Sequence, residues 1–302
     1  MQRLSTKNSF QSPTLTKGST WQRLAVSTAF AVLLSSTFIF LAALPLRYQR
    51  LVFGRNIFIG VGLAITAALA SFQQWSWAVV YFGLSLLIGS FREFEEKGAG
   101  LFTSSLMAIF TTLGAGYMAL KLWAETQSSS VSQMLEGQLS PFVSQLTEMP
   151  QFKNSLTLES LIFYLPSGMI ISMMLVIFVS LTISGERKRP QPLNRFKAFV
   201  LPDWMIWIFI GSLGATFALP QLPELSIIGG NVLSVTLAAY FFQGLAVFTC
   251  FLDSLKIYGF WRMLAYFLVF FQLFIFVSGL GILDYWFDFR EQLKNKLTST
   301  HI

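Results

Sequence analysis

Charged residues are scarce in this sequence, at 12% of 302 residues, where an ordinary soluble domain has roughly 25%. A soluble protein needs charge on its water-facing surface, so this shortage argues against a soluble enzyme. The uncharged stretches are 24–46, 56–91, 98–120, 160–185, 204–223, 225–252 and 263–283. Each is long enough for the roughly 20 apolar residues of a membrane-spanning helix, and 56–91 is long enough for two.

Cysteine and histidine each occur once, as Cys250 and His301. A single cysteine excludes an internal disulfide framework, and one histidine excludes the usual catalytic or metal-binding clusters. The ATPase motif GxxxxGK[ST] is also missing. We therefore expect no enzyme activity, no metal, no cofactor and no ATPase in this chain. The net charge of +7 does not indicate nucleic acid as a partner. The basic residues cluster between apolar runs, where they set topology and contact anionic lipid.

The predicted fold is all-α, a polytopic transmembrane helix bundle with about eight membrane segments. The predicted spans are roughly 24–46, 56–72, 75–91, 100–123, 158–184, 203–220, 228–252 and 263–283. The predicted domains are a basic flexible tail over 1–23, a single transmembrane helical domain over 24–290 and a C-terminal tail over 291–302. Segment 24–46 is either one span or a broken hairpin. Pro45, and the basic run directly after it, are compatible with the hairpin.

The distribution of lysine and arginine predicts the orientation. Residues 186–197 carry five positive charges, so the loop over 185–200 is predicted to be cytoplasmic. The long loop over 124–157 is then predicted to face the opposite side. Its apolar residues recur at helical spacing, which predicts an amphipathic helix interrupted near Pro141. This helix either lies in the membrane interface or covers a binding cavity.

A few residues within the spans suggest packing or binding. Gln243 lies in the middle of its span, where its amide either bonds a neighbouring helix or binds a ligand. Pro166 predicts a kink whose freed carbonyl groups contact either a ligand or a neighbouring group. The glycine pairs Gly114/Gly116 and Gly211/Gly214 are expected to permit close helix packing.

The candidate ligand-binding or interaction residues are Asp203, Trp204, Gln243, Asp284, Trp286, Asp288 and Arg290. Asp203 follows Pro202, and its side chain is expected to cap free amides at a helix N-terminus. The predicted topology places Asp203 near the cytoplasmic surface and residues 284–290 near the opposite one. Arg290 is expected to point away from Asp284. The sequence therefore predicts two separate interface features and one buried amide.

Three motifs resemble those of one family: LPDWMIW at 201–207, YFFQGLAV at 240–247 and LDYWFDFR at 283–290. Together they are similar to the YybS-like family of predicted bacterial membrane proteins, domain of unknown function 2232. The resemblance implies a bacterial inner-membrane protein in contact with the lipid bilayer. That family in turn resembles the substrate-binding subunits of energy-coupling-factor transporters, which implies small-molecule binding and a partner ATPase. The alternative is a non-catalytic scaffold that recruits a membrane complex through its cytoplasmic loops.

Overall fold

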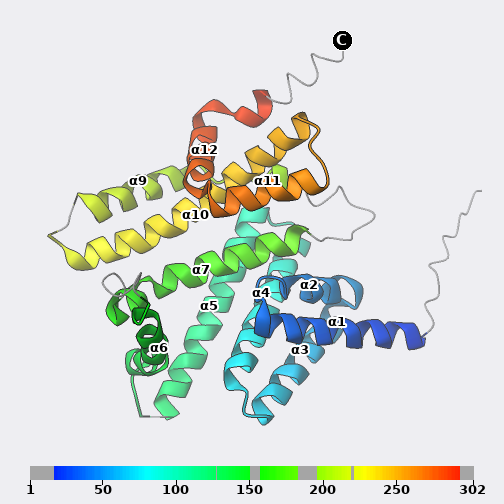
Figure 1. The fold of residues 1–302 in the computed structure, drawn as a ribbon. Coiled ribbons are helices and arrows are strands. Elements are labelled where there is room, and N and C mark those ends of the chain that lie inside the picture. Colours follow the sequence, from blue (N-terminus) through cyan, green and yellow to red (C-terminus); the bar gives the residue numbers. More distant parts are fainter. Residues whose placement is uncertain (1–16, 127, 150–156, 183–195, 219–220, 293–302) are drawn as a thin grey trace, which may run out of the picture. The chain divides into compact units, whose positions relative to one another are not determined.

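The computed structural model describes residues 17–126, 128–149, 157–182, 196–218 and 221–292. Its described elements are all helices, which confirms the all-α prediction (Figure 1). They are α1 (Lys17–Thr37), α2 (Ala43–Val52), α3 (Gly54–Ser71), α4 (Trp75–Glu96), α5 (Leu101–Thr126), α6 (Val131–Thr147), α7 (Leu158–Thr182), α9 (Trp204–Phe217), α10 (Pro223–Ser254), α11 (Phe260–Phe271) and α12 (Phe274–Phe287). Most of the basic loop over 185–200 and most of both tails lie outside the described residues.

Among the described helices, α3, α4, α5, α7 and α10 are long and apolar enough to cross a membrane. The predicted count of about eight is not confirmed, because the described residues contain five such helices, or six if α11 and α12 form one span. That last pair is bent by 95°, so the span predicted over 263–283 is either a broken span or a re-entrant loop. Helix α9 is apolar, but its 14 residues measure only ~21 Å, less than the ~30 Å hydrocarbon core.

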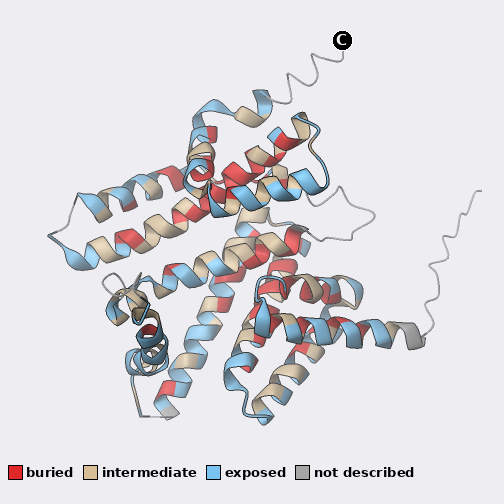
Figure 2. Ribbon diagram, in the orientation of Figure 1, coloured by how far each residue is buried: buried red, intermediate tan, exposed pale blue. Residues whose placement is uncertain are grey.

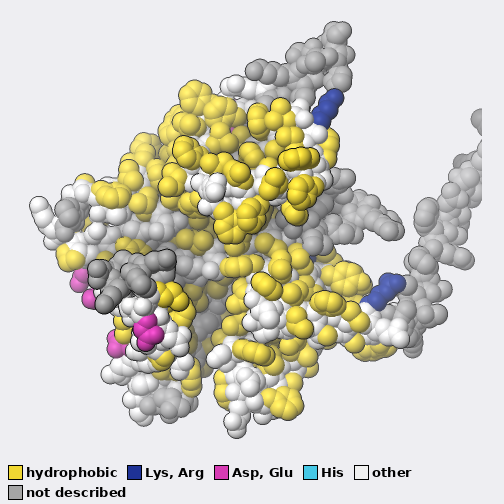
Figure 3. Space-filling model, viewed as in Figure 1, with side chains coloured by type: hydrophobic (Ala, Val, Ile, Leu, Met, Phe, Trp, Pro, Cys, Tyr) yellow, Lys and Arg dark blue, Asp and Glu magenta, His cyan; other side chains and the backbone are white. Residues whose placement is uncertain are grey.

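Large apolar side chains are exposed over much of the viewed surface (Figure 3). Trp207, Phe217 and Phe276 are each more than 70% exposed. A soluble monomer rarely leaves contiguous apolar surface of this kind open to water, whereas a bilayer accepts it. The surface therefore agrees with a protein that crosses the membrane several times.

The chain divides into two compact units, residues 1–85 and 86–302, with the boundary inside α4. In the first unit, α1 ends at Thr37 and α2 begins at Ala43, so no single helix covers 24–46. Whether this segment crosses the membrane or returns as a hairpin stays a prediction. The hydroxyl groups of Ser35, Ser36 and Thr37 all donate to carbonyl oxygens one turn back. Such bonds compete with helix propagation, and α1 ends at this cluster.

In the second unit, α10 is the central helix, and α7, α9 and α12 pack against it. Its buried residues run through the middle of the helix (Figure 2). Helices α10 and α12 meet at Gly244 and Gly281. A Cβ atom on Gly244 would lie 1.9 Å from the carbonyl oxygen of Val277, and one on Gly281 would lie 2.0 Å from that of Tyr240. Only glycine permits backbones to approach this closely.

Helix α7 continues through Pro166, and a side chain of α10 bonds its backbone at that point. The amide of Asn231 donates from Nδ2 to the carbonyl oxygen of Phe163 (2.8 Å) and accepts at Oδ1 from the N–H of Ser167 (3.3 Å). In an uninterrupted helix, those two backbone groups would bond each other. A neighbouring helix therefore satisfies the backbone groups beside the proline, as one of the sequence alternatives expected.

The helix predicted within 124–157 is found as α6. It begins after a capping box, in which Ser130 and Gln133 each accept a hydrogen bond from the other residue's backbone N–H. The predicted interruption near Pro141 is wrong, because α6 runs through this residue to Thr147. Whether α6 lies in the interface or covers a cavity stays a prediction.

Candidate functional site

A buried ion pair lies at the end of α12. Asp288 ends this helix in the left-handed conformation (φ 45°, ψ 50°), which turns the chain so that Arg290 returns toward Asp284. The guanidinium donates from Nε (3.1 Å) and from Nη2 to Oδ2 of Asp284. The two side chains are only 12% and 2% exposed. The prediction that Arg290 points away from Asp284 is therefore wrong, because it assumed that the helix continued.

Gln243 joins this pair to a segment that precedes α9. Its Nε2 donates to Oδ2 of Asp284 (3.2 Å), and its Oε1 accepts from the backbone N–H of Leu201 (3.0 Å). The side chain is 2% exposed. Of the two alternatives for this amide, the structure shows the hydrogen bond to a neighbouring helix.

Arg290 fastens the same segment by a second route. Its Nη1 donates to the carbonyl oxygens of Lys197 (3.1 Å) and Phe199 (2.8 Å). We call this arrangement the clasp: the side chains of Gln243, Asp284 and Arg290, with the backbone of residues 197–201. The clasp ties three parts of the chain that lie more than 40 residues apart.

The predicted separation of Asp203 from residues 284–290 is therefore wrong. Arg290 bonds the carbonyl oxygen of Phe199, four residues before Asp203. The prediction assumed that a straight helix carries the chain across the bilayer after residue 263. A 95° bend between α11 and α12 instead returns Asp284 to the middle of α10.

A second ion-pair network holds the start of this segment, and the sequence analysis missed it. Asp253, at the end of α10, pairs through Oδ2 with Lys197 and through Oδ1 with Arg262 (2.8 Å). Arg262 also donates to the hydroxyl oxygen of Tyr266 (3.3 Å), which bonds Thr249 (2.9 Å). The sequence feature that could have indicated this network is a pair of opposite charges, Asp253 and Arg262, on the two sides of the turn between α10 and α11.

The other predicted residues lie outside the clasp. Asp203, Trp204, Trp286 and Asp288 are all exposed. The expected cap at Asp203 is wrong, because its side chain makes no capping hydrogen bond. Trp204 contacts Phe102 edge to face, with ring centroids 6.0 Å apart. These residues are placed to face lipid or a partner rather than to line a buried site.

The polar groups of the clasp bond one another and the backbone. Oδ2 of Asp284 accepts all three hydrogen bonds from Arg290 and Gln243, while its buried Oδ1 meets no donor among the described residues. The carboxylate neutralises the guanidinium, and the guanidinium binds two peptide carbonyls. Breaking such a pair leaves a buried charge without compensation, so the clasp resists opening.

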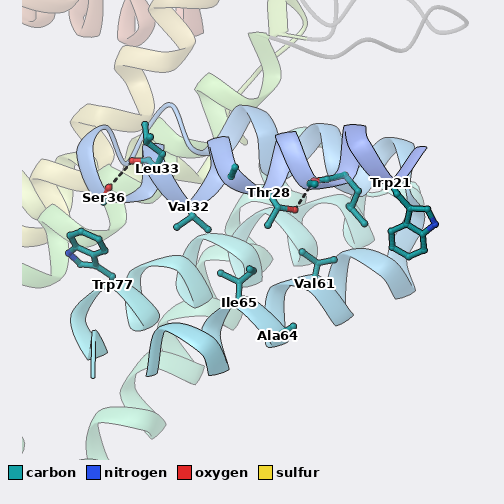
Figure 4. Close-up of a pocket in the computed structure, with 12 residues that line it drawn as sticks. Trp21, Thr28, Val32, Leu33, Ser36, Val61, Ala64, Ile65 and Trp77 are labelled. Carbon is teal, nitrogen blue, oxygen red and sulfur yellow. Dashed lines mark hydrogen bonds between the residues drawn. The ribbon is translucent and has the colours of Figure 1, made fainter. Parts of the chain in front are cut away.

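A separate apolar groove of about 830 Å³ lies in the first unit (Figure 4). It is lined by Trp21, Leu24, Ala25, Thr28, Ala29, Val32, Leu33 and Ser36 of α1, Val61, Ala64 and Ile65 of α3, and Trp77 of α4. This groove was not predicted from the sequence. Its signal was a row of small side chains in two apolar stretches, which leave space where larger ones would fill it.

The two hydroxyl groups in the groove already bond the protein. Thr28 donates to the carbonyl oxygen of Leu24 (2.8 Å) and accepts from Nε2 of Gln49 (3.2 Å). Ser36 donates to the carbonyl oxygen of Leu33 (2.7 Å). The groove therefore offers a ligand chiefly apolar contact, which is the usual character of small-molecule sites.

Comparison with known proteins identifies a family. A family model described as "Predicted membrane protein (DUF2232)" matches residues 23–285. This match spans much more of the chain than the three motifs in its last third. No curated protein and no solved structure matches the chain.

Proposed function

Because the chain belongs to the DUF2232 family of predicted membrane proteins, we propose that it binds an apolar small molecule within the cytoplasmic membrane of a bacterium. In this proposal it is the substrate-binding component of a transport system. The observation that supports it is the groove between α1 and α3. Two tryptophans, Trp21 and Trp77, lie at opposite ends of this groove (Figure 4).

The polar groups of the protein favour an apolar ligand over a polar one. In the groove, both hydroxyl groups are bonded to the protein's own atoms. In the second unit, the clasp uses the strongest donors and acceptors for internal bonds. A ligand that accepts hydrogen bonds would have to break those bonds, and each buried group left unpaired costs about 1–3 kcal/mol.

Transport would require a partner that supplies energy. The sequence contains no GxxxxGK[ST] motif, so a proposed carrier role calls for an ATPase on another chain. This arrangement is similar to that of energy-coupling-factor transporters. We also propose that the protein binds its ligand without catalysing a reaction and without a cofactor.

The test is a substitution that fills the groove with a larger side chain, followed by a measurement of which bound compound is lost. Ala64 lines the groove and is exposed, so Ala64→Trp adds bulk there without entering the core. Ala67→Trp is the matched control, because Ala67 is exposed on the same helix and does not line the groove. Native mass spectrometry of protein purified with native lipids should show an apolar compound that Ala64→Trp loses and Ala67→Trp retains. Equal retention in both variants would rule out the groove as the binding site.

A scaffold is the second candidate, and one observation favours it. The basic residues 186–197 end at the segment that the clasp and the Lys197–Asp253 pair hold. A firmly held flank would suit a loop that presents positive charge to a partner complex. Affinity purification separates the two functions. A scaffold predicts an envelope or division complex that Ala64→Trp retains and Arg290→Gln releases, whereas a carrier predicts a co-purifying ATPase.

A further inference from the structure

Resting on the proposed function, we infer that the groove takes the acyl chain of an anionic lipid, with the headgroup at the Arg23 end. Three observations lead to this ligand: the length of the groove, the chemistry of its lining and the position of charge along it. Each is a property of the first unit alone.

The groove is long and apolar. Its lining extends along α1 from Trp21 to Ser36, which is ~22 Å at the rise of an α-helix. Its facing wall is formed by residues of α3 (Figure 4). An extended hydrocarbon chain matches such a shape. It binds without hydrogen bonds, and the lining offers few.

An exposed positive charge flanks one end of this lining. Arg23 is exposed and lies between Trp21 and Leu24, both of which line the groove. No charged residue occurs in 24–46 or in 56–91, the stretches that supply the rest of the lining. A long arginine side chain beside an apolar surface extends its charge toward the headgroup layer. Trp21, 67% exposed at the same end, suits that layer too.

The acyl chain and the headgroup of the lipid therefore contribute separately to binding. The apolar lining binds the chain of any lipid, and Arg23 selects the charge of the headgroup. One arginine near a membrane surface favours an anionic over a zwitterionic headgroup by about fivefold.

The experiment uses photoreactive lipids with a diazirine in the acyl chain. The full-length protein is placed in nanodiscs of phosphatidylcholine that contain either photoreactive phosphatidylglycerol or photoreactive phosphatidylcholine. After irradiation, peptide mapping should find labels at Val32 and Ile65 above the level at Ile275, which is 75% exposed and reports general lipid contact. Phosphatidylglycerol should label the groove about fivefold more than phosphatidylcholine.

Two variants separate the headgroup from the chain. Arg23→Gln should bring the ratio of the two lipids close to one and leave labelling by phosphatidylcholine unchanged. Lys121→Gln, an exposed charge on α5 far along the chain from the groove, should keep the ratio of the unaltered protein. Ala64→Trp should remove groove labelling by both lipids, and Ala67→Trp should retain it.

The outcomes distinguish the inference from the function on which it rests. Equal labelling by the two lipids in the unaltered protein, abolished by Ala64→Trp, would overturn the anionic headgroup and support apolar binding. Groove labelling no higher than at Ile275 for either lipid would overturn both. A preference for phosphatidylglycerol that Arg23→Gln leaves intact would overturn the role of Arg23.

Discussion

Replacement of Arg290 by methionine is the most informative perturbation of the clasp. Methionine preserves an unbranched, flexible side chain and removes the guanidinium. The change deletes both bonds to Asp284 and both bonds to the carbonyl groups of Lys197 and Phe199. Asp284 is 2% exposed, so its carboxylate then stays buried with Gln243 as its one remaining donor in the clasp.

Removing one partner of a buried ion pair costs about 3–5 kcal/mol. Asp284→Leu should cost less, about 2 kcal/mol, because Arg290 retains two carbonyl acceptors and hydrogen bonds to charged groups are worth about 1.5–3 kcal/mol. The double variant leaves no uncompensated charge in the pair, so its cost should be about 2–3 kcal/mol. The two substitutions are therefore expected to be non-additive by about 3 kcal/mol.

Thermal unfolding in detergent, followed by circular dichroism, measures this difference. In a unit of this size, 1 kcal/mol corresponds to roughly 2–4 °C, so Arg290→Met should lower the melting temperature by about 10 °C. The double variant should unfold at a higher temperature than Arg290→Met alone. If the effects of the two single changes simply add, Arg290 and Asp284 have no coupling energy. That result would refute the inference that this ion pair stabilises the clasp.

Three further substitutions, with Gly214→Ala as a control, test the packing around α10. Gly244→Ala should destabilise the protein by more than 1 kcal/mol, because the new Cβ would meet backbone atoms. Gly214→Ala should be neutral or slightly stabilising, because open space surrounds that position. Thermal unfolding compares the two variants. Asn231→Leu should cost about 1 kcal/mol through the lost bonds to α7, and an unchanged melting temperature would exclude a stabilising role for the amide. Gln243→Leu should speed hydrogen exchange at the amide of Leu201, and an unaltered exchange rate there would contradict the bond described above.

Local hydropathy predicted the membrane helices that are straight. The predicted spans 56–72 and 75–91 correspond closely to Gly54–Ser71 and Trp75–Glu96. Each is an uninterrupted apolar stretch whose own composition determines its length. The bend between α11 and α12 was not predictable in this way, because the residues around Gln272 are as apolar as the helices on either side of them.

The sequence predicted which residues belong to the candidate site, but not that they contact one another. Gln243, Asp284 and Arg290 stood out as polar groups in or beside apolar spans, and the structure joins all three. Their contact depends on the left-handed conformation of Asp288, which few residues other than glycine adopt. Lys197 was counted as a topology signal, although its carbonyl and its side chain are both bound.

The glycines show why composition alone does not locate close packing. Gly114, Gly116, Gly211 and Gly214 were expected to permit helix contact, yet a Cβ at each would meet open space. The tight contacts are at Gly244, Gly281 and Gly229. A glycine in a span shows where two backbones could meet, but the partner helix is set by distant parts of the chain.

The clasp also imposes an order on biosynthesis. Ribosomes make Lys197, Leu201, Gln243 and Asp284 before Arg290, so the segment that precedes α9 enters the membrane without the guanidinium that later holds it. Until Arg290 is in place, Asp284 has Gln243 as its one donor in the clasp. A chain truncated before residue 290 would keep that carboxylate buried without its cation, which leaves an uncompensated charge. The turn at Asp288 therefore completes the clasp last, and with it the bonds that hold the segment before α9.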